Sequence, residues 1–481
     1  MGCVGNPYTQ AIGGRSGGAV IRLFKHYVPH TVLLLGLIDF VLLMLSAEGG
    51  WLLREWQIGG GLDPEVSRLP NILAFAVTLE LAMVGVGVYA LDALRSMRFA
   101  VARLIVAISL GALLLSVVFF LAPWVTFWRS NLLYAMLIAL LLLTGARILL
   151  GRTLDGEAFK RRILVLGAGP RAARLEALAG REGAGFTIAG YIGMNDGPIA
   201  VAHAVNRSDI VNLPAHVLRL GAGEVVLALE ERRNALPLAD LLRIKTTGVH
   251  VNDLSSFLER ETGRVDLDSL NPSWLIFSDG FSAGRRLSGM GKRLFDIVVS
   301  AAILLLTFPI VLLTALAVKL ESEGPAFFRQ RRIGLYGQGF DILKLRSMRQ
   351  DAEVGGVAVW AEQDDPRVTR VGQIIRKLRI DELPQAWSVL KGEMSFVGPR
   401  PERPQFVSDL EARLPYYAER HMVKPGITGW AQINYPYGAS VDDARQKLEY
   451  DLYYAKNYTP FLDLLILLQT MRVILWPAGA R

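Results

Sequence analysis

Four long apolar runs in the first 150 residues constrain this chain more than any other feature of its sequence. They cover roughly residues 28–45, 71–91, 101–121 and 132–150. Each is long enough to cross a hydrocarbon layer about 30 Å thick as a helix that rises about 1.5 Å per residue. The chain has 481 residues, of which 52% are hydrophobic. These runs predict a multi-domain membrane protein whose residues 28–150 form a four-helix transmembrane bundle.

Segments rich in lysine and arginine alternate with segments that are not, along the ends and loops of these runs. Basic residues precede the first run, lie between the second and third, and follow the fourth, whereas residues 46–70 carry more acid than base. Basic loops stay in the cytoplasm, so segment 1–27 and everything after residue 150 are predicted to be cytoplasmic. Asp39 and Glu80 lie inside two of the runs, and no cation is near either in its own run. We expect these two carboxylates to face the bundle interior or to pair with one another.

The overall charge and the cysteine content narrow the class of protein further. The formal net charge is +8, which in a membrane protein favours attraction to anionic lipid on the cytoplasmic side. Nucleic-acid binding is not expected, because no recognition motif accompanies the charge. A single cysteine, Cys3, excludes an intramolecular disulfide and is typical of a reducing compartment.

Residues 155–270 are predicted to form a doubly wound α/β (Rossmann-like) domain. Strands are expected at 163–166, 186–192, 224–229 and 248–252, and Gly167 and Gly169 belong to a G-x-G-x-x-A turn after the first strand. Such glycines let backbone N–H groups approach a pyrophosphate. The acid that should confirm a dinucleotide site comes late, with Asn195 and Asp196 as the nearest candidates. A domain that only regulates or supports the rest of the chain remains an open alternative.

Two more apolar segments follow a linker at residues 271–291. Residues 294–320 are long enough for a fifth crossing, but basic residues flank both ends and Pro309 sits inside. A proline bends a helix, and a helix that returns to its own side satisfies the charge rule, so we predict a re-entrant membrane hairpin with Pro309 at its bend. A true fifth span is the alternative. Residues 461–476 are predicted to form an interfacial helix or, alternatively, a helix of the core.

An adjacent carboxylate pair, Asp381-Glu382, marks the segment best suited to chemistry. With Mg²⁺ and a diphosphate substrate, one carboxylate can ligate the metal while the other acts as nucleophile or base. Such a pair alone means little, because solvated helix surfaces carry many. Other residues nearby in the sequence favour a functional role for the pair. Arg400 is held between Pro399 and Pro401 and is pre-ordered to bind a phosphate with two hydrogen bonds.

Basic side chains also cluster between the apolar segment 294–320 and the carboxylate pair. They could meet a lipid phosphate or a nucleotide phosphate, although each cluster alone is equally typical of a solvated face. The candidates for phosphate or nucleotide binding are Arg400 with its flanking prolines, Arg329, Arg332, Lys344, Arg346 and Arg379.

The order of motifs after residue 292 resembles a known family. RQRRIG, KLRSM, DPRVTRVG, RIDELPQ, GEMSFVGPRP and VKPGITGWAQIN resemble the bacterial sugar transferases, the monotopic phosphoglycosyl transferases. Four spans and a nucleotide-fold domain in front resemble the long exopolysaccharide-type polyprenyl glycosylphosphotransferases. The resemblance implies that residues 292–481 form a mainly α-helical catalytic domain on the cytoplasmic face of a bacterial inner membrane.

The resemblance also implies a two-step reaction with Asp381 as nucleophile. Asp381 would attack the β-phosphate of a UDP-sugar, release UMP and pass the phosphosugar to polyprenyl (undecaprenyl) phosphate, which starts exopolysaccharide or O-antigen-type assembly. Glu382 would help to bind Mg²⁺ or assist as a base, and residues 399–401 resemble the family's nucleotide-side motif. The implied partners are the UDP-sugar, polyprenyl phosphate and membrane lipids. A homo-oligomer and contacts with downstream glycosyltransferases are compatible with this setting.

Three other interpretations remain open at the level of the sequence. The first is a nucleotide-dependent oxidoreductase or epimerase that uses the turn at residues 167–173, against which the late acid counts. The second is a non-catalytic membrane scaffold that recruits assembly partners. The third is an ordinary glycosyltransferase that uses Asp364-Asp365 as its metal site and releases UDP.

Overall fold

The computed structural model describes residues 20–23, 26–59, 68–89, 97–153, 160–181, 184–194, 199–230, 236–270, 286–349, 367–436, 438 and 440–475. The chain forms two compact units, which we describe separately. The first holds most residues up to Thr262, and the second holds mainly Gly263–Arg481. Several predicted features lie outside the described residues: most of segment 1–27, most of the linker 271–291, Asn195 and Asp196, and Asp364-Asp365.

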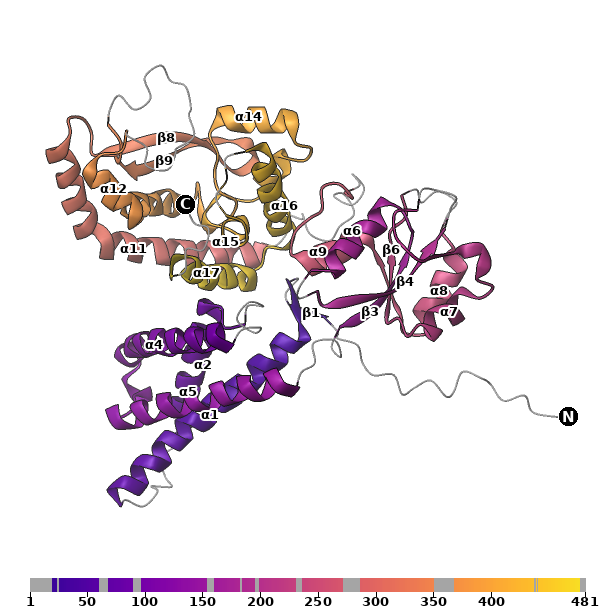
Figure 1. Cartoon of the computed structure of the whole chain (residues 1–481). Helices are drawn as coiled ribbons and strands as arrows, with labels where there is room; N and C mark the ends of the chain where they lie inside the picture. Colours follow the sequence, from indigo (N-terminus) through magenta and orange to yellow (C-terminus); the bar gives the residue numbers. More distant parts are fainter. Residues whose placement is uncertain are drawn as a thin grey trace. The chain divides into compact units, whose positions relative to one another are not determined.

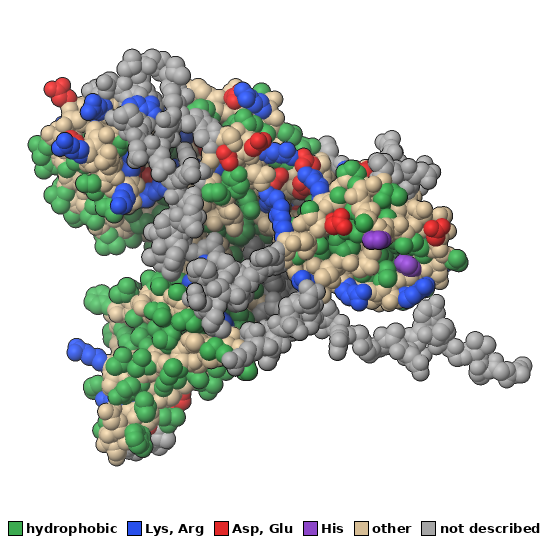
Figure 2. All heavy atoms as spheres, viewed as in Figure 1, with side chains coloured by type: hydrophobic (Ala, Val, Ile, Leu, Met, Phe, Trp, Pro, Cys, Tyr) green, Lys and Arg blue, Asp and Glu red, His purple; other side chains and the backbone are tan. Residues whose placement is uncertain are grey.

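Four apolar helices form the N-terminal part of the first unit (Figure 1): α1 (His30–Ile58), α2 (Leu69–Val86), α4 (Met97–Leu121) and α5 (Arg129–Thr153). The strands β1 (Val20–Leu23) and β2 (His26–Pro29) precede them, and a 3-10 turn, η1 (Pro123–Val125), follows α4. Each helix contains a stretch long and apolar enough to cross a membrane, and Figure 2 shows hydrophobic side chains over much of their surface. Gly50 of α1 lies directly against Ala135 of α5, where only a small residue permits so close an approach. The chain is a membrane protein.

Helix α1 is longer than its apolar run predicts. It continues to Ile58 through Glu48 and Glu55, which we expected in a loop. Arg68 lies 2.5 Å from Glu55 Oε1 and 3.7 Å from Glu48 Oε1. The same cation therefore offsets both acids, so these charges do not end the helix.

A buried ion pair connects α1 and α5. Asp39 is fully buried, and Arg147 donates hydrogen bonds to its two carboxylate oxygens at 3.1 and 2.5 Å. The Tyr89 hydroxyl lies 2.9 Å from Asp39 Oδ2 and 2.6 Å from Glu80 Oε1. Asp39 faces the interior as expected, and its cation comes from another helix because its own run carries none.

We expect Arg147→Met to destabilise the bundle by about 3–5 kcal/mol, because it leaves Asp39 buried without its charge partner. The double variant Asp39→Asn, Arg147→Met should lose less than the sum of the single losses, since no unpaired charge remains. Unfolding of the full chain in detergent measures this cycle, with Ser116→Ala, an exposed site on α4, as control. Purely additive losses would show that the two side chains do not interact energetically.

A parallel sheet of five strands forms the centre of the α/β domain, in the order β5-β4-β3-β6-β7. Its strands are β3 (Arg161–Leu166), β4 (Phe186–Gly193), β5 (Ala204–Asn206), β6 (Glu224–Leu227) and β7 (His250–Asp253), and a 3-10 turn, η2 (Arg207–Asp209), follows β5. Successive side chains of β3 face opposite sides. Ile163 and Val165 pack with α6 (Pro170–Ala179) and α9 (Leu254–Thr262), and Leu164 and Leu166 pack with α7 (Leu213–Arg219) and α8 (Leu238–Thr246). The predicted doubly wound α/β domain with a parallel sheet is confirmed, although the short edge strand β5 was not predicted.

The second unit combines helices with two small sheets (Figure 1). Strand β8 (Phe327–Ile333) pairs antiparallel with β9 (Gly339–Leu345), and β10 (Ser395–Val397) pairs parallel with β11 (Gly426–Thr428). The sequence predicts a mainly helical unit and missed both sheets, because basic residues interrupt the apolar alternation of β8. The helices are α11 (Arg286–Glu321), α12 (Arg370–Lys377), α13 (Ala386–Lys391), α14 (Pro404–Arg413), α15 (Trp430–Asn434), α16 (Val441–Asn457) and α17 (Pro460–Leu475), with 3-10 segments η3 (Leu335–Gly337), η4 (Ile380–Gln385) and η5 (Ala418–Met422).

The core of this unit lies between α16, α17 and the short strands. Leu452 and Tyr453 of α16 and Leu462 and Ile466 of α17 are fully buried in one apolar cluster. The described side chains of α17 thus favour the core-helix alternative over the interfacial one, and Trp476 lies outside the described residues. The chain enters this core at Gly263, whose carbonyl oxygen accepts a hydrogen bond from Trp430 Nε1 at 2.7 Å. The boundary between the units therefore falls at residue 262, whereas the sequence places the end of the α/β domain at 270.

Helix α11 is anchored at both ends to the second unit and exposed between them. At its start, Lys292 Nζ donates to Val397 O at 3.1 Å, and Arg293 donates to Val389 O at 2.7 Å. Near its end, Val318 packs in a small apolar cluster with residues of β9 and α12. Leu305, by contrast, is 76% exposed. Figure 1 shows the helix changing direction along its length, and Pro309 lies inside it.

Candidate active site

Asp381 and Glu382, which we call the dyad, lie on the short 3-10 segment η4 directly after α12. Arg379 makes the bend between α12 and η4. Its φ of 57° lies in the left-handed region that residues other than glycine rarely adopt. Asp381 is 8% exposed, and the Glu382 side chain is 14% exposed. The bend places two adjacent carboxylates in a largely buried position, and backbone strain of this kind clusters at functional sites.

Three cations surround the Glu382 carboxylate. Lys344 Nζ donates to Oε1 at 3.0 Å, Arg400 Nη2 donates to the same oxygen at 3.3 Å, and Arg379 lies 4.0 Å from Oε2. Burial alone would raise the pKa of Glu382, but Arg400, Lys344 and Arg379 outweigh it and hold this pKa well below its usual range. A carboxylate whose pKa lies far below the working pH has little affinity for a proton and is therefore a poor general base. The geometry therefore favours an electrostatic role for Glu382 over the predicted alternative of a base.

Asp381 has a different environment from its neighbour. Burial and the adjacent Glu382 raise the pKa of Asp381, against the opposing effect of Lys344 and the two arginines nearby. Its Oδ1 atom is buried and has no hydrogen-bond partner within the part of the chain that the structure describes. Leaving a buried acceptor unpaired costs free energy, so this oxygen is poised to meet an incoming electrophile or cation.

The parallel strands β10 and β11 hold the loop at residues 399–401. Gly398 N donates to Thr428 O, and Gly426 N donates to Pro399 O, each at 2.9 Å. Glycine is required at 398 because a Cβ there would overlap neighbouring backbone atoms. The loop directs the guanidinium of Arg400, which is 38% exposed, to the dyad. The predicted phosphate-binding arginine and the predicted carboxylate pair are thus brought together.

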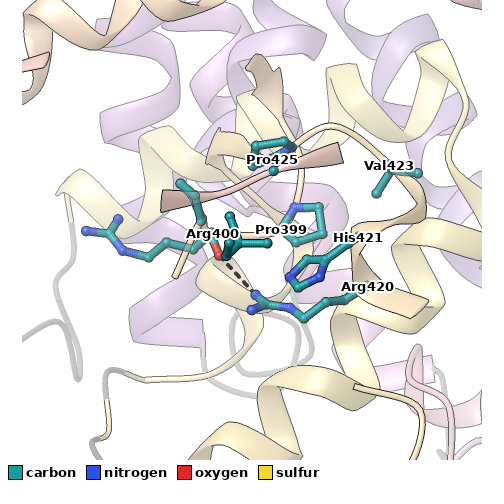
Figure 3. Close-up of a pocket in the computed structure, with 9 residues that line it drawn as sticks. Pro399, Arg400, Arg420, His421, Val423 and Pro425 are labelled. Carbon is teal, nitrogen blue, oxygen red and sulfur yellow. Dashed lines mark hydrogen bonds between the residues drawn. The ribbon is translucent and has the colours of Figure 1, made fainter. Parts of the chain in front are cut away.

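A small pocket lies beside the backbone of this loop (Figure 3). The Arg400 side chain extends away from His421, while its carbonyl oxygen accepts a hydrogen bond from Arg420 at 3.0 Å. Burial, with the nearby Arg420, lowers the pKa of His421 to about 4, so this imidazole is neutral near pH 7. The pocket is lined by Ile333, Gly334, Pro399, Arg400, Pro401, Arg420, His421, Val423 and Pro425.

The other predicted basic residues fall into two groups. Lys344 and Arg379 lie at the dyad, and Arg332 Nη1 donates to Pro401 O at 3.2 Å, which braces the loop. Arg346 donates to the carbonyl of Glu323 at 2.7 Å and so caps the end of α11. Arg329 is exposed on β8, on the face of the hairpin opposite to Lys344. The geometry gives no support to phosphate binding by Arg346 or Arg329.

Magnesium was predicted to bind Asp381 and Glu382. Across the described ranges, no group of three or more His, Cys, Asp or Glu side chains converges. Mg²⁺ commonly takes one or two carboxylates together with substrate phosphates and water, without an all-protein cage. The buried, unpaired Oδ1 of Asp381 fits such a substrate-borne ion. Glu382, already paired with two cations, is the poorer ligand.

Other residues of the chain lie against the glycine turn of the α/β domain, where a dinucleotide would bind. Gly167 has a φ of 129° and lies against the carbonyl of Ala228, and Gly169 precedes α6. A dinucleotide pyrophosphate would sit at the N-terminus of α6. There, Glu230 Oε1 accepts a hydrogen bond from Arg171 N at 3.0 Å, and the Arg171 side chain lies 3.3 Å from Glu230 Oε2. A carboxylate at this position competes with a phosphate, so the turn exists as predicted but disfavours a dinucleotide.

Three charged residues of the site escaped the sequence analysis. Arg376 is among the cations that lower the pKa of Asp381. It lies three residues before Arg379, and this spacing was the signal that could have indicated it from the sequence. Arg420 and Asp451 form a buried pair behind the 399–401 loop, with 2.7 Å between Nη2 and Oδ2. An aspartate inside the aromatic run YDLYY was the signal for that pair.

Comparison with known proteins identifies the family. The model of the bacterial sugar transferase family matches residues 287–477. A protein from Caulobacter vibrioides named UDP-glucose:undecaprenyl-phosphate glucose-1-phosphate transferase is 46% identical over 188 residues, which cover 38% of this chain and 69% of that protein. The chain belongs to the bacterial sugar transferase family. The family match includes the dyad, Lys344 and the 399–401 loop.

Two further relatives are longer than the matched segment. An Aeromonas hydrophila protein named UDP-N-acetylgalactosamine-undecaprenyl-phosphate N-acetylgalactosaminephosphotransferase is 45% identical over 241 residues, which cover 50% of this chain and 56% of that protein. An Escherichia coli UDP-glucose:undecaprenyl-phosphate glucose-1-phosphate transferase is 43% identical over 190 residues, which cover 38% of this chain and 41% of that protein. The chain thus spans about half the length of these two members of the family.

Proposed function

We propose that this chain transfers a sugar 1-phosphate from a UDP-sugar to undecaprenyl phosphate, or a similar polyprenyl phosphate, through a covalent intermediate on Asp381. The observation that carries the proposal is the unpaired Oδ1 of Asp381 beside Glu382, whose charge is offset by Lys344 and Arg400. The names of the relatives, which specify glucose 1-phosphate or N-acetylgalactosamine phosphate and undecaprenyl phosphate, support the same reaction.

The reaction has two displacement steps at one phosphorus atom. In the first, a carboxylate oxygen of Asp381 bonds to the β-phosphorus of the UDP-sugar, and the bond from this phosphorus to the bridging oxygen breaks. UMP leaves with that oxygen and its electron pair. In the second, a phosphate oxygen of the polyprenyl phosphate attacks the same phosphorus and the Asp381 carboxylate leaves, which yields the polyprenyl diphosphate sugar. Bound Mg²⁺ would neutralise charge on the diphosphate.

The cations of the site are suited to a phosphoryl group in transfer. Catalysis of such a step depends mainly on positioning and electrostatic stabilisation. Arg400 and Lys344 converge on one oxygen of Glu382, so both are held in place before a substrate arrives. Arg379 is 62% exposed and lies 4.0 Å from Glu382 Oε2, so it can meet the diphosphate from the solvent. Glu382 thus orders the cations around the nucleophile.

The identity of the nucleotide released tests this proposal against its rivals. Purified chain with UDP-sugar, Mg²⁺ and polyprenyl phosphate should release UMP. UDP-glucose and UDP-N-acetylgalactosamine are the first donors to try, because the relatives' names specify these sugars. Release of UDP would indicate an ordinary glycosyltransferase, and release of neither nucleotide would indicate a scaffold. The oxidoreductase alternative is weakened by Glu230, which occupies the N-terminus of α6.

We also propose that α11 enters the cytoplasmic leaflet of a bacterial inner membrane and returns to the same side. Its two ends contact the same compact unit, and apolar side chains between them are exposed, such as Leu306 and Leu313. A straight helix that crossed a bilayer would place its two ends on opposite sides of the membrane. Pro309 supplies the bend.

Cysteine labelling from the periplasmic side tests this topology. In a Cys3→Ser background, which removes the single native cysteine, Lys319→Cys and Arg329→Cys should remain unlabelled by a membrane-impermeant maleimide. Trp124→Cys, an exposed site between α4 and α5, should be labelled and serves as the positive control. Labelling at residue 319 or 329 in intact cells would reject the hairpin.

A further inference from the structure

Arg420 lies behind the 399–401 loop and is almost fully buried. Its Nη2 donates to Asp451 Oδ2 at 2.7 Å and to the carbonyl oxygen of Arg400 at 3.0 Å. Its Nε donates to the same carboxylate at 3.1 Å, and its Nη1 donates to the Tyr417 hydroxyl at 2.8 Å. Each nitrogen of this guanidinium therefore has an acceptor, and one acceptor is the backbone of the arginine that contacts the dyad.

The two charged partners come from elements far apart in the chain. Arg420 and Tyr417 lie at η5, and Asp451 lies on α16, where it is 2% exposed. A guanidinium is planar and presents its donors in a fixed fork. Because Asp451 binds the Arg420 guanidinium through two of its nitrogens, the guanidinium has a fixed direction. Its Nη2 atom then holds the carbonyl oxygen of Arg400 in place. Figure 3 shows this hydrogen bond as a dashed line.

The hydrogen bond to this carbonyl holds the backbone from which the Arg400 side chain extends. Flanking prolines restrict the backbone on both sides of Arg400, but they do not lock the peptide plane that follows it. With its carbonyl held by Arg420, Arg400 directs its side chain the other way, and Nη2 comes to 3.3 Å from Glu382 Oε1. Without that bond the backbone at residue 400 would be held less firmly, and the partly exposed side chain would leave Glu382 more readily.

We infer that Arg420 and Asp451 form a clamp that positions Arg400 against the dyad. They are positioning residues, because they act on the reaction through Arg400 and do not touch the reacting atoms. The kinetic consequence of the clamp rests on the function proposed above, whereas its effect on the 399–401 loop does not.

Hydrogen exchange of the full-length chain in detergent tests the effect on the loop. Arg420→Lys keeps the charge but loses the fork, and Asp451→Asn removes the carboxylate. In both variants the amides of Gly398 and Gly426, which bond to Thr428 O and Pro399 O, should exchange roughly tenfold faster, the change expected from loss of one hydrogen bond to a charged group. Asp268→Asn, which removes the exposed partner of Arg445 on the same helix α16, is the matched control and should leave these amides unchanged.

A double-variant cycle separates a positioning role from a merely structural one. Rates of UMP release are compared for Arg400→Met, Arg420→Lys and the combination. If the clamp acts only through the Arg400 side chain, adding Arg420→Lys to Arg400→Met should change the rate less than about twofold, although Arg420→Lys alone should lower it roughly tenfold or more. A general loss of folded protein would instead multiply the two effects.

The outcomes distinguish this inference from the proposed function. A wild-type chain that releases no UMP would reject the proposed function, and hydrogen exchange would still decide whether the clamp holds the loop. Unchanged exchange of the Gly398 and Gly426 amides in both variants, or multiplicative losses in the cycle, would overturn the clamp. Should Asp451→Asn fail to fold, Tyr417→Phe, which removes one acceptor of Arg420, provides a milder variant that should also raise exchange in the loop.

Discussion

Replacing Asp381 with Asn should abolish UMP release, lowering its rate by at least about 10³-fold, because removal of a covalent nucleophile has effects of this order or larger. The amide is nearly isosteric with the carboxylate but cannot form the acyl phosphate. Since Asp381 Oδ1 has no hydrogen-bond partner in the described part of the chain, the substitution breaks no contact of that atom. The measurement is UMP formed from UDP-sugar in a single turnover.

The covalent step has its own readout. Wild-type chain incubated with UDP-sugar but without polyprenyl phosphate should gain the mass of one phosphosugar, and the Asp381→Asn chain should not. Asp409→Asn is the matched control, since Asp409 is an exposed carboxylate on α14 that pairs with Arg413. UMP release at the wild-type rate by Asp381→Asn would eliminate the aspartyl intermediate.

Replacing Arg400 with Met should lower the rate of UMP release by about 10²–10³-fold, the usual cost of removing one preorganised donor from a transition state. Arg400 donates to Glu382 from a half-exposed position, so its loss removes a cation from the site without opening the core. The rate constant under single-turnover conditions, at saturating UDP-sugar, is the quantity to compare.

Two further variants serve as comparisons for Arg400→Met. Arg400→Lys keeps a positive charge but loses the paired hydrogen bonds of the guanidinium, so its rate should fall between wild type and Arg400→Met. Arg331→Met removes an arginine that is 60% exposed on β8 and pairs with Asp341, and it should leave the rate unchanged. An Arg400→Met chain as fast as wild type would place the transferring phosphate elsewhere.

Much of the architecture followed from patterns that depend on local chemistry alone. Long apolar runs predict membrane helices because the hydrocarbon sets their length. Short apolar strands beside glycine turns predict a parallel sheet because both of its faces are buried. The end of α1 could not be predicted, since Arg68, which offsets its acids, lies beyond the helix. The β8–β9 hairpin was missed because Arg329, Arg331 and Arg332 conceal its alternation.

The candidate site was predictable where its residues are adjacent in the sequence. Asp381 and Glu382, and Arg400 between its prolines, stand out as motifs. The sequence could not show that Arg346 caps α11 while Lys344, two residues before it, reaches Glu382. Strand alternation alone places both side chains on the same face, and only the packed structure separates their roles. The pairing of Arg420 with Asp451 joins positions far apart in the chain, and no local pattern encodes it.

The manner in which α11 is fastened bears on how firmly this chain would stay on a membrane. A helix tied down at Lys292 and Arg293 and again beyond Val318 cannot slip out of a bilayer by one end. On the proposed hairpin, removing its apolar middle from the membrane would require lifting the whole second unit at once. Residence on the membrane would then survive deletion of the first four helices, which makes those helices redundant as tethers.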